Sequence, residues 1–173
     1  MSKVFYLAYG SNLHPLRLQE RVPSASVVGV VELSEYKLMF HKRSTDDSGK
    51  CLLSKTLDDL SKVYAVLYEF DDSHKSALDN AEGVGNGYYE ELISVSLGEN
   101  DYSAYIYMAS TTHIDTALIP YTWYKKLVIV GAGFHNFPVD YIASIELVPS
   151  KEDFKKSRLT DNQNLLERML AYT

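Results

Sequence analysis

Apolar residues fall along the chain in short runs rich in Val, Leu, Tyr and Phe, which are typical of strands. The clearest run is 63–70. Both of its alternating sets of positions are largely apolar, so we expect a strand that is covered on both faces. Further strands are predicted at 3–9, at 27–40 as one long strand or two short ones, and at 50–56, 88–97 and 102–109.

Short helices are predicted where these runs are interrupted. Gly10-Ser11-Asn12 ends the first strand. With Asn12 as N-cap and Pro15 in the first turn, a helix is expected from about 13 to 21. Further helical regions are predicted at 74–81 after Asp71-Asp72-Ser73 and before Gly83, from Pro120 toward Gly131 or Gly133, from Pro138, and in the charged stretch after residue 150.

The order of these elements indicates the fold class. Strands mostly follow one another with a few short helices inserted, which differs from the regular strand–helix alternation of a parallel sheet. We therefore predict an α+β protein: a small, mixed, mostly antiparallel β-barrel with short helices on its outside. The length of 173 residues favours one domain, which we assign to 1–150, followed by a charged helical tail at 151–173.

The amino-acid composition disfavours several classes of function. With 46% apolar and 23% charged residues the chain resembles ordinary soluble proteins, and a net charge of −6 without a basic block disfavours nucleic-acid binding. A single cysteine, Cys51, excludes an internal disulfide and a multi-cysteine zinc site. No apolar run is long enough to span a membrane, and Met1-Ser2-Lys3 leads directly into a strand, so a cytoplasmic location is expected.

The turn Gly10-Ser11-Asn12 is the first candidate site. Gly10 and Asn12 tolerate a positive φ angle, and a turn between a strand and a helix directs several N–H groups toward one point. The helix N-terminus adds partial positive charge there, so a carboxylate would bind well. The alternative is a capping turn that binds no ligand.

Glu82 is the second candidate, because it lies among the apolar and small residues Leu78, Ala81 and Val84. A carboxyl group that is buried without a cationic partner has a raised pKa, which suits general acid/base catalysis near neutral pH. The alternatives are an exposed glutamate at a helix end, or the neighbouring Asp79 in its place.

Other catalytic chemistries find little support. The five histidines show no metal-ligand spacing, so no metal site is predicted. Ser11 lacks a recognisable base, and neither a Gly-x-Ser-x-Gly motif nor a phosphate loop is present. Tyrosine is abundant, with 14 residues that either fill half-buried strand positions or, in a few cases, line a polar pocket.

Two segments resemble the gamma-glutamylcyclotransferase superfamily. Tyr9-Gly10-Ser11-Asn12-Leu13 resembles its substrate-binding loop, and Leu78-Asp79-x-x-Glu82-Gly83-Val84-x-x-Gly87-x-Tyr89 resembles the region that carries its catalytic glutamate. The resemblance continues in register over about 5–148, and it is nearer to the gamma-glutamylcyclotransferases proper than to the glutathione-specific or gamma-glutamylamine branches. It implies nothing functional for the tail.

The resemblance implies a small mixed barrel with peripheral helices and a reaction that needs no cofactor. The free α-amine of a γ-glutamyl group attacks its own γ-carbonyl, forming 5-oxoproline and releasing the attached amino acid. It also implies residue roles: Glu82 as catalytic acid/base, the backbone N–H groups of Gly10, Ser11 and Asn12 on the substrate α-carboxylate, and Tyr9, Tyr89 and either Tyr105 or, as we favour, Tyr107 on the pocket wall.

Three functions stay open at this point. The leading one is a cyclotransferase for γ-glutamyl amino acids or dipeptides. The second keeps the mechanism but acts on a γ-glutamylamine or a γ-glutamylated biosynthetic intermediate, and the third is a non-catalytic small-molecule binding module. A homodimer is the commonest assembly for such chains, and 128–130 and 134–137 are either its contact or core.

Overall fold

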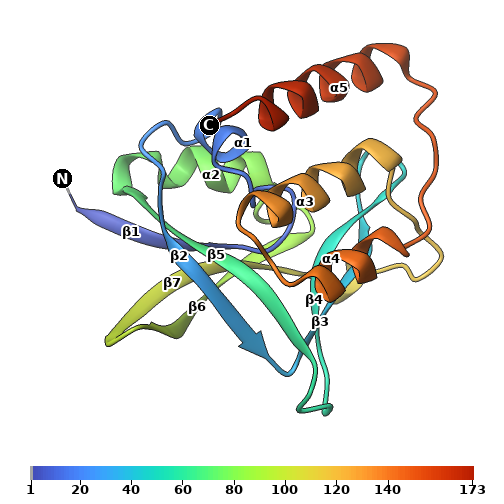
Figure 1. Ribbon diagram of the computed structural model, residues 1–173. Coiled ribbons are helices and arrows are strands. Elements are labelled where there is room, and N and C mark those ends of the chain that lie inside the picture. The colour runs from blue at the N-terminus through green and yellow to red at the C-terminus, as the bar shows by residue number, and fades with distance from the viewer. Residues whose placement is uncertain (1) are drawn as a thin grey trace.

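The computed structural model describes residues 2–173. The strands are β1 (Lys3–Ala8), β2 (Ser26–Ser34), β3 (Tyr36–Arg43), β4 (Gly49–Lys55), β5 (Lys62–Asp71), β6 (Tyr88–Leu97) and β7 (Asn100–Ala109). The α-helices are α1 (Pro15–Gln19), α2 (Lys75–Glu82), α3 (Thr122–Phe134), α4 (Val139–Glu146) and α5 (Lys156–Leu170), with short 3₁₀ turns η1 (Asp72–His74) and η2 (Thr111–His113). Figure 1 shows their arrangement.

The strands form a curled five-stranded sheet and a separate hairpin. The order in the large sheet is β2-β5-β1-β7-β6, and β3 pairs with β4. Only the β1–β7 pair is parallel among these pairings, and the others are antiparallel. The predicted α+β class with a mixed, mostly antiparallel sheet is confirmed, and the 27–40 run forms two strands, β2 and β3.

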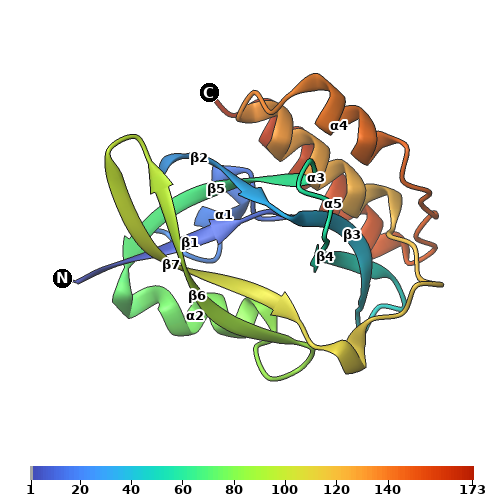
Figure 2. The same ribbon diagram turned by 90° about the horizontal axis from the view of Figure 1, so that it is seen from below.

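Helices cover the sheet on two sides. α3, α4 and α5 lie together, and α2 lies away from them beside β6 and β7 (Figure 2).

β5 is central, between β2 and β1, and Val63, Ala65, Val66 and Leu67 are fully buried, as the two-sided apolar pattern predicts. In α3, Val128 is buried in the core, and Ile129 and Val130 are partly buried against it. No helix within residues 2–173 is long and apolar enough to cross a membrane.

The first helix differs from its prediction. α1 comprises only Pro15–Gln19, and its N-cap is His14, whose Nδ1 accepts the Leu16 N–H at 3.2 Å. Asn12 was expected as N-cap, and that prediction is wrong because its side chain is used elsewhere. Its amide donates to Tyr6 at 3.2 Å and to Glu82 at 2.7 Å, so Asn12 is part of a polar cluster instead.

The second helix ends as its sequence predicts. Gly83 is the C-cap in the left-handed conformation with φ 69°, and its N–H bonds the carbonyl of Asn80. The following N–H, from Val84, bonds the carbonyl of Asp79 at 3.0 Å. Because glycine adopts this conformation without a Cβ clash, α2 stops with Glu82 as its last residue.

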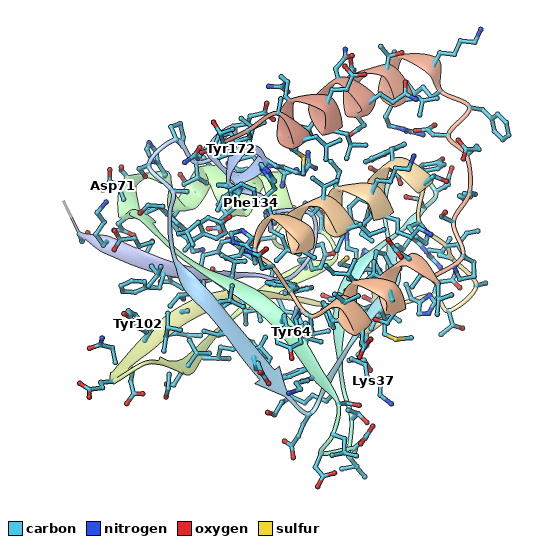
Figure 3. All side chains as sticks on the ribbon, viewed as in Figure 1. Lys37, Tyr64, Asp71, Tyr102, Phe134 and Tyr172 are labelled. Carbon is cyan, nitrogen blue, oxygen red and sulfur yellow. The ribbon has the colours of Figure 1, made fainter. Side chains whose placement is uncertain are left out.

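The charged tail folds onto the rest of the molecule. α5 buries Leu165, Leu166 and Met169, and the segment before it places Asp153 between Arg158 and the indole N–H of Trp123. Near the end of the chain Tyr172 approaches Phe134 of α3, with ring centroids 5.8 Å apart (Figure 3). The helix predicted for this tail is present, and the division into a domain and a tail stays a prediction.

His14 should make stability depend on pH. Burial, followed by the nearby His135, lowers the pKa of His14 from 6.5 to about 4. The unfolded chain therefore binds a proton at His14 between these two pH values and the folded chain does not, so stability rises with pH across this window. Between pH 7 and 4 the free energy of unfolding should fall by up to about 3 kcal/mol from this group alone. Denaturant titrations at both pH values measure the loss.

The matched variant is His14→Asn, which keeps a side-chain acceptor at the N-cap and removes the titrating ring. Its stability should decline less than that of the unmodified chain over the same window. Equal declines in the two proteins would show that His14 does not contribute.

Candidate active site

The two candidate motifs, although 70 residues apart in the chain, meet in space. Asn12 Nδ2 donates to Glu82 Oε1 at 2.7 Å, which joins the turn after β1 to the last residue of α2. A small cavity of about 20 Å³ lies at this junction, walled by Tyr6, Tyr9, Gly10, Ser11, Asn12, Cys51, Glu82, Tyr88, Tyr107 and Tyr124. We call it the inner cavity.

Glu82 is held by one of its two oxygens. Oε1 accepts from Asn12 and, at 2.8 Å, from Arg21 Nη1, which also donates to Asn12 Oδ1 at 3.0 Å. Within residues 2–173, Oε2 has no hydrogen-bond partner. Glu82 is therefore not buried without a cationic partner, because Arg21 forms an ion pair with it. This pairing fixes the carboxylate in place and leaves one oxygen free to exchange a proton.

The turn offers backbone donors to the same cavity. In the described part of the chain, no acceptor bonds the N–H groups of Gly10, Ser11 and Asn12. Gly10 and Asn12 tolerate a positive φ angle, but the structure shows it at neither residue. Glycine is required at position 10 for a different reason: a Cβ there would lie 2.9 Å from Cys51 Cβ. The turn is therefore packed tightly against β4.

The tyrosine hydroxyls of the inner cavity are largely occupied. Tyr9 donates to the carbonyl of Tyr107 at 2.5 Å, and Tyr107 donates to Asp79 at 2.6 Å. Tyr107 rather than Tyr105 lies on the cavity wall, and Asp79, the rival of Glu82, bonds Tyr107 and Lys75 outside that wall. Tyr9 lies on the wall as well, and because its hydroxyl is occupied it contributes a ring surface to the cavity.

Tyr89 does not line the cavity, and this prediction is corrected. β6 begins at Tyr88, and successive side chains of a strand point to opposite faces. Tyr88 is 8% exposed, and its hydroxyl donates to the carbonyl of Cys51, whereas Tyr89 is 43% exposed. The neighbouring tyrosine, Tyr88, therefore takes the place on the wall that the sequence assigned to Tyr89.

Similarity to known proteins agrees with this geometry. A family model described as the AIG2-like family matches residues 62–145. A gamma-glutamylcyclotransferase from Mus musculus is 30% identical over 163 residues, which cover 90% of this chain and 83% of that protein. The chain belongs to the gamma-glutamylcyclotransferase/AIG2-like family. The gamma-glutamylcyclotransferase from Bos taurus is 27% identical over 174 residues, covering 97% of this chain and 90% of its own.

Solved structures support the fold. A structure described as gamma-glutamyl cyclotransferase superposes with a TM-score of 0.80 at 22% identity, covering 96% of this chain and 99% of the other. YkqA from Bacillus subtilis superposes with a TM-score of 0.70 at 20% identity over 87% of this chain and 57% of its own. The curled mixed sheet with peripheral helices is thus the fold of this family.

The sequence alone assigned no role to several residues that line the inner cavity. Tyr6 accepts from Asn12, and Tyr124 accepts from the Cys51 N–H at 3.1 Å. Burial raises the pKa of both phenols, and it raises the pKa of the Cys51 thiol to about 12. These groups are therefore neutral near pH 7. The alternation of β1 places Tyr6 on the same face as Ala8, a signal that could have suggested Tyr6 in advance.

A larger hollow lies elsewhere. A groove of about 550 Å³ runs between β3, β5 and α4, lined in part by Tyr36, Tyr64 and Asp140. It does not include Glu82 or the Gly10-Ser11-Asn12 turn, and exposed residues such as Lys37 form its rim. The chemistry therefore points to the smaller inner cavity. Residues 2–173 contain no group of three or more His, Cys, Asp or Glu side chains that could hold a metal ion.

Proposed function

We propose that this protein is a gamma-glutamylcyclotransferase that converts a γ-glutamyl amino acid or dipeptide into 5-oxoproline and a free amino acid. The observation that carries the proposal is the contact between Asn12 and Glu82, which brings a carboxylate beside three backbone N–H groups that have no acceptor within residues 2–173. The family relationship supports the same chemistry, because the relatives from Mus musculus and Bos taurus carry this name.

Substrate binding is assigned to the turn after β1. The backbone N–H groups of Gly10, Ser11 and Asn12 hold the substrate α-carboxylate in the proposed complex. A substrate fixed at this end keeps its α-amine close to its own γ-carbonyl, and such positioning can supply much of a rate enhancement. The rings of Tyr9, Tyr88 and Tyr107 restrict the glutamyl chain to a compact shape.

Proton transfer is assigned to Glu82. The α-ammonium loses two protons as it becomes the lactam N–H, and the leaving nitrogen gains two as it becomes an ammonium, so the overall reaction is neutral in protons. The new C–N bond closes the five-membered ring, and the γ-amide C–N bond breaks. Glu82 Oε2 takes a proton from the α-amine and delivers one to the leaving amine, while Arg21 and Asn12 keep the carboxylate in position.

Release of 5-oxoproline from γ-glutamyl-alanine is the direct test. We expect turnover by the purified protein without added metal or cofactor, measured by chromatography of 5-oxoproline. A panel with γ-glutamyl alkylamines separates the second candidate substrate class, since those compounds share the mechanism and lack the carboxylate of the leaving amino acid. Binding of γ-glutamyl compounds with no turnover of any of them would contradict the proposal and leave a binding module.

A further inference from the structure

A second hollow lies against the inner cavity. It has a volume of about 220 Å³ and shares Ser11, Glu82, Tyr88 and Tyr124 with the inner cavity. We call it the outer cleft. Four cationic side chains line it, Arg17, Arg21, Lys42 and Lys50, and Glu82 is the only carboxylate among its lining residues. This concentration of positive charge contrasts with the net charge of −6 for the whole chain.

Two of the four cations already have carboxylate partners. Arg21 pairs with Glu82 at 2.8 Å, and Lys50 pairs with Asp46 at 2.7 Å. Lys50 also lies over the rings of Trp123 and Tyr124, 4.8 and 4.5 Å from their centroids. The charges of Arg21 and Lys50 are therefore compensated by protein carboxylates without a ligand.

The other two cations have no such partner. Lys42 is only 7% exposed, and within residues 2–173 no carboxylate forms a salt bridge with it, because Glu82 and Asp46 act on it only at longer range. Its Nζ lies 4.4 Å from the centroid of the Tyr88 ring. Arg17 Nε is buried without a hydrogen-bond partner, and no carboxylate in the described chain pairs with this side chain. Burying an unpaired cation is costly, so two such groups facing one cleft indicate a site built for negative charge.

The pKa shifts of Lys42 and Arg17 are consistent with a site for negative charge. Burial lowers the pKa of Lys42, and it lowers the pKa of Arg17 to about 10. Arg17 therefore remains cationic near pH 7. A bound anion would favour the charged forms of both side chains and offset part of the desolvation cost.

The location of the outer cleft relative to Glu82 decides which part of the substrate it receives. The inner cavity adjoins the Gly10-Ser11-Asn12 turn, which the proposed function assigns to the glutamyl end. The outer cleft begins at Glu82, where the leaving nitrogen receives its proton, and extends to Lys42 and Lys50. The amino acid beyond the scissile amide is therefore the part that meets these cations.

We propose that the outer cleft selects γ-glutamyl compounds whose leaving amino acid is acidic, so that its two carboxylates meet the two unpaired cations Lys42 and Arg17. This inference rests on the proposed function and specifies its substrate class. γ-Glutamyl alkylamines, which present no carboxylate to the cleft, should be the poorest substrates. Neutral leaving amino acids, with one carboxylate, should be intermediate.

The test compares γ-glutamyl-glutamate with γ-glutamyl-glutamine, which have nearly the same shape and differ by one charge. We expect kcat/KM to be about tenfold or more higher for the acidic compound, since a charge-assisted contact is stronger than a neutral one. In Lys42→Met the ratio of the two kcat/KM values should approach one. The change should appear mainly as a higher KM for γ-glutamyl-glutamate, because the cleft binds the substrate and takes no part in the reaction. Lys126→Met, an exposed lysine of α3, is the charge-matched control and should keep the ratio.

The outcomes separate the two proposals. Equal kcat/KM for the two dipeptides in the unmodified protein, alongside turnover of γ-glutamyl-alanine, would overturn the acidic preference and leave the cyclotransferase function intact. A preference that persists in Lys42→Met would overturn the role of Lys42. Absence of 5-oxoproline from every γ-glutamyl compound would overturn both. The dipeptide comparison needs no variant, so it decides the question even if Lys42→Met fails to fold.

Discussion

Glu82→Gln is expected to lower kcat for 5-oxoproline formation by about 10²–10⁴-fold while the protein still folds. The glutamine carbonyl can accept from Asn12 and Arg21 as Glu82 Oε1 does, so the local contacts survive. Its amide nitrogen replaces Oε2, which has no hydrogen-bond partner among the described residues, and cannot take a proton. The measurement is single-turnover release of 5-oxoproline from γ-glutamyl-alanine, with thermal melting to confirm folding.

The control for this variant is Glu99→Gln, which makes the same chemical change in the exposed turn between β6 and β7. It should keep the rate of the unmodified protein. Glu82→Gln with kcat within a few-fold of that rate would remove Glu82 from the mechanism. Asp79→Asn would then be the next variant to examine, although Asp79 is bonded to Tyr107 and Lys75.

Much of the fold could be predicted because its signals are local. The two-sided apolar pattern of 63–70 identified the central strand β5, and the glycine after Glu82 fixed the end of α2. The strands at 88–97 and 102–109 needed only alternation and the turn between them. Asn12 was assigned to the wrong role for the same reason: a local capping rule favours it, and a partner 70 residues away overrides that rule.

The candidate site was predictable only in part. The turn and Glu82 could be identified from their motifs, whereas Arg21, Arg17 and Lys42 carry no local signal. Lys42 belongs to β3 and reaches the Tyr88 ring at the start of β6, a contact that exists only after the hairpin and the large sheet are assembled. Which of Tyr88 and Tyr89 faces the cavity depends on a register difference of one residue. Side-chain alternation shows that the two face opposite ways, but it does not show which of them faces inward.

Gly10→Val is expected to lower kcat/KM by about 10²-fold, because it disturbs the turn that holds the substrate α-carboxylate in the proposed complex. A Cβ at this position would lie 2.9 Å from Cys51 Cβ and 3.2 Å from Cys51 Sγ. Either the turn or β4 must move, and β4 is tied to the cavity wall through the Cys51 N–H and carbonyl, which bond Tyr124 and Tyr88. Steady-state kinetics with γ-glutamyl-alanine measure the effect.

Gly133→Val is the matched control, because a Cβ at Gly133 would meet nothing within 4 Å. It should change kcat/KM little. A second variant tests the cause: in Gly10→Ala combined with Cys51→Gly, the Cβ and Sγ atoms that the new methyl group would meet are removed, which relieves the contact. It should recover part of the activity that Gly10→Ala alone loses. A Gly10→Val protein with unchanged kcat/KM would show that the turn tolerates displacement, and substrate anchoring at Gly10, Ser11 and Asn12 would have to be abandoned.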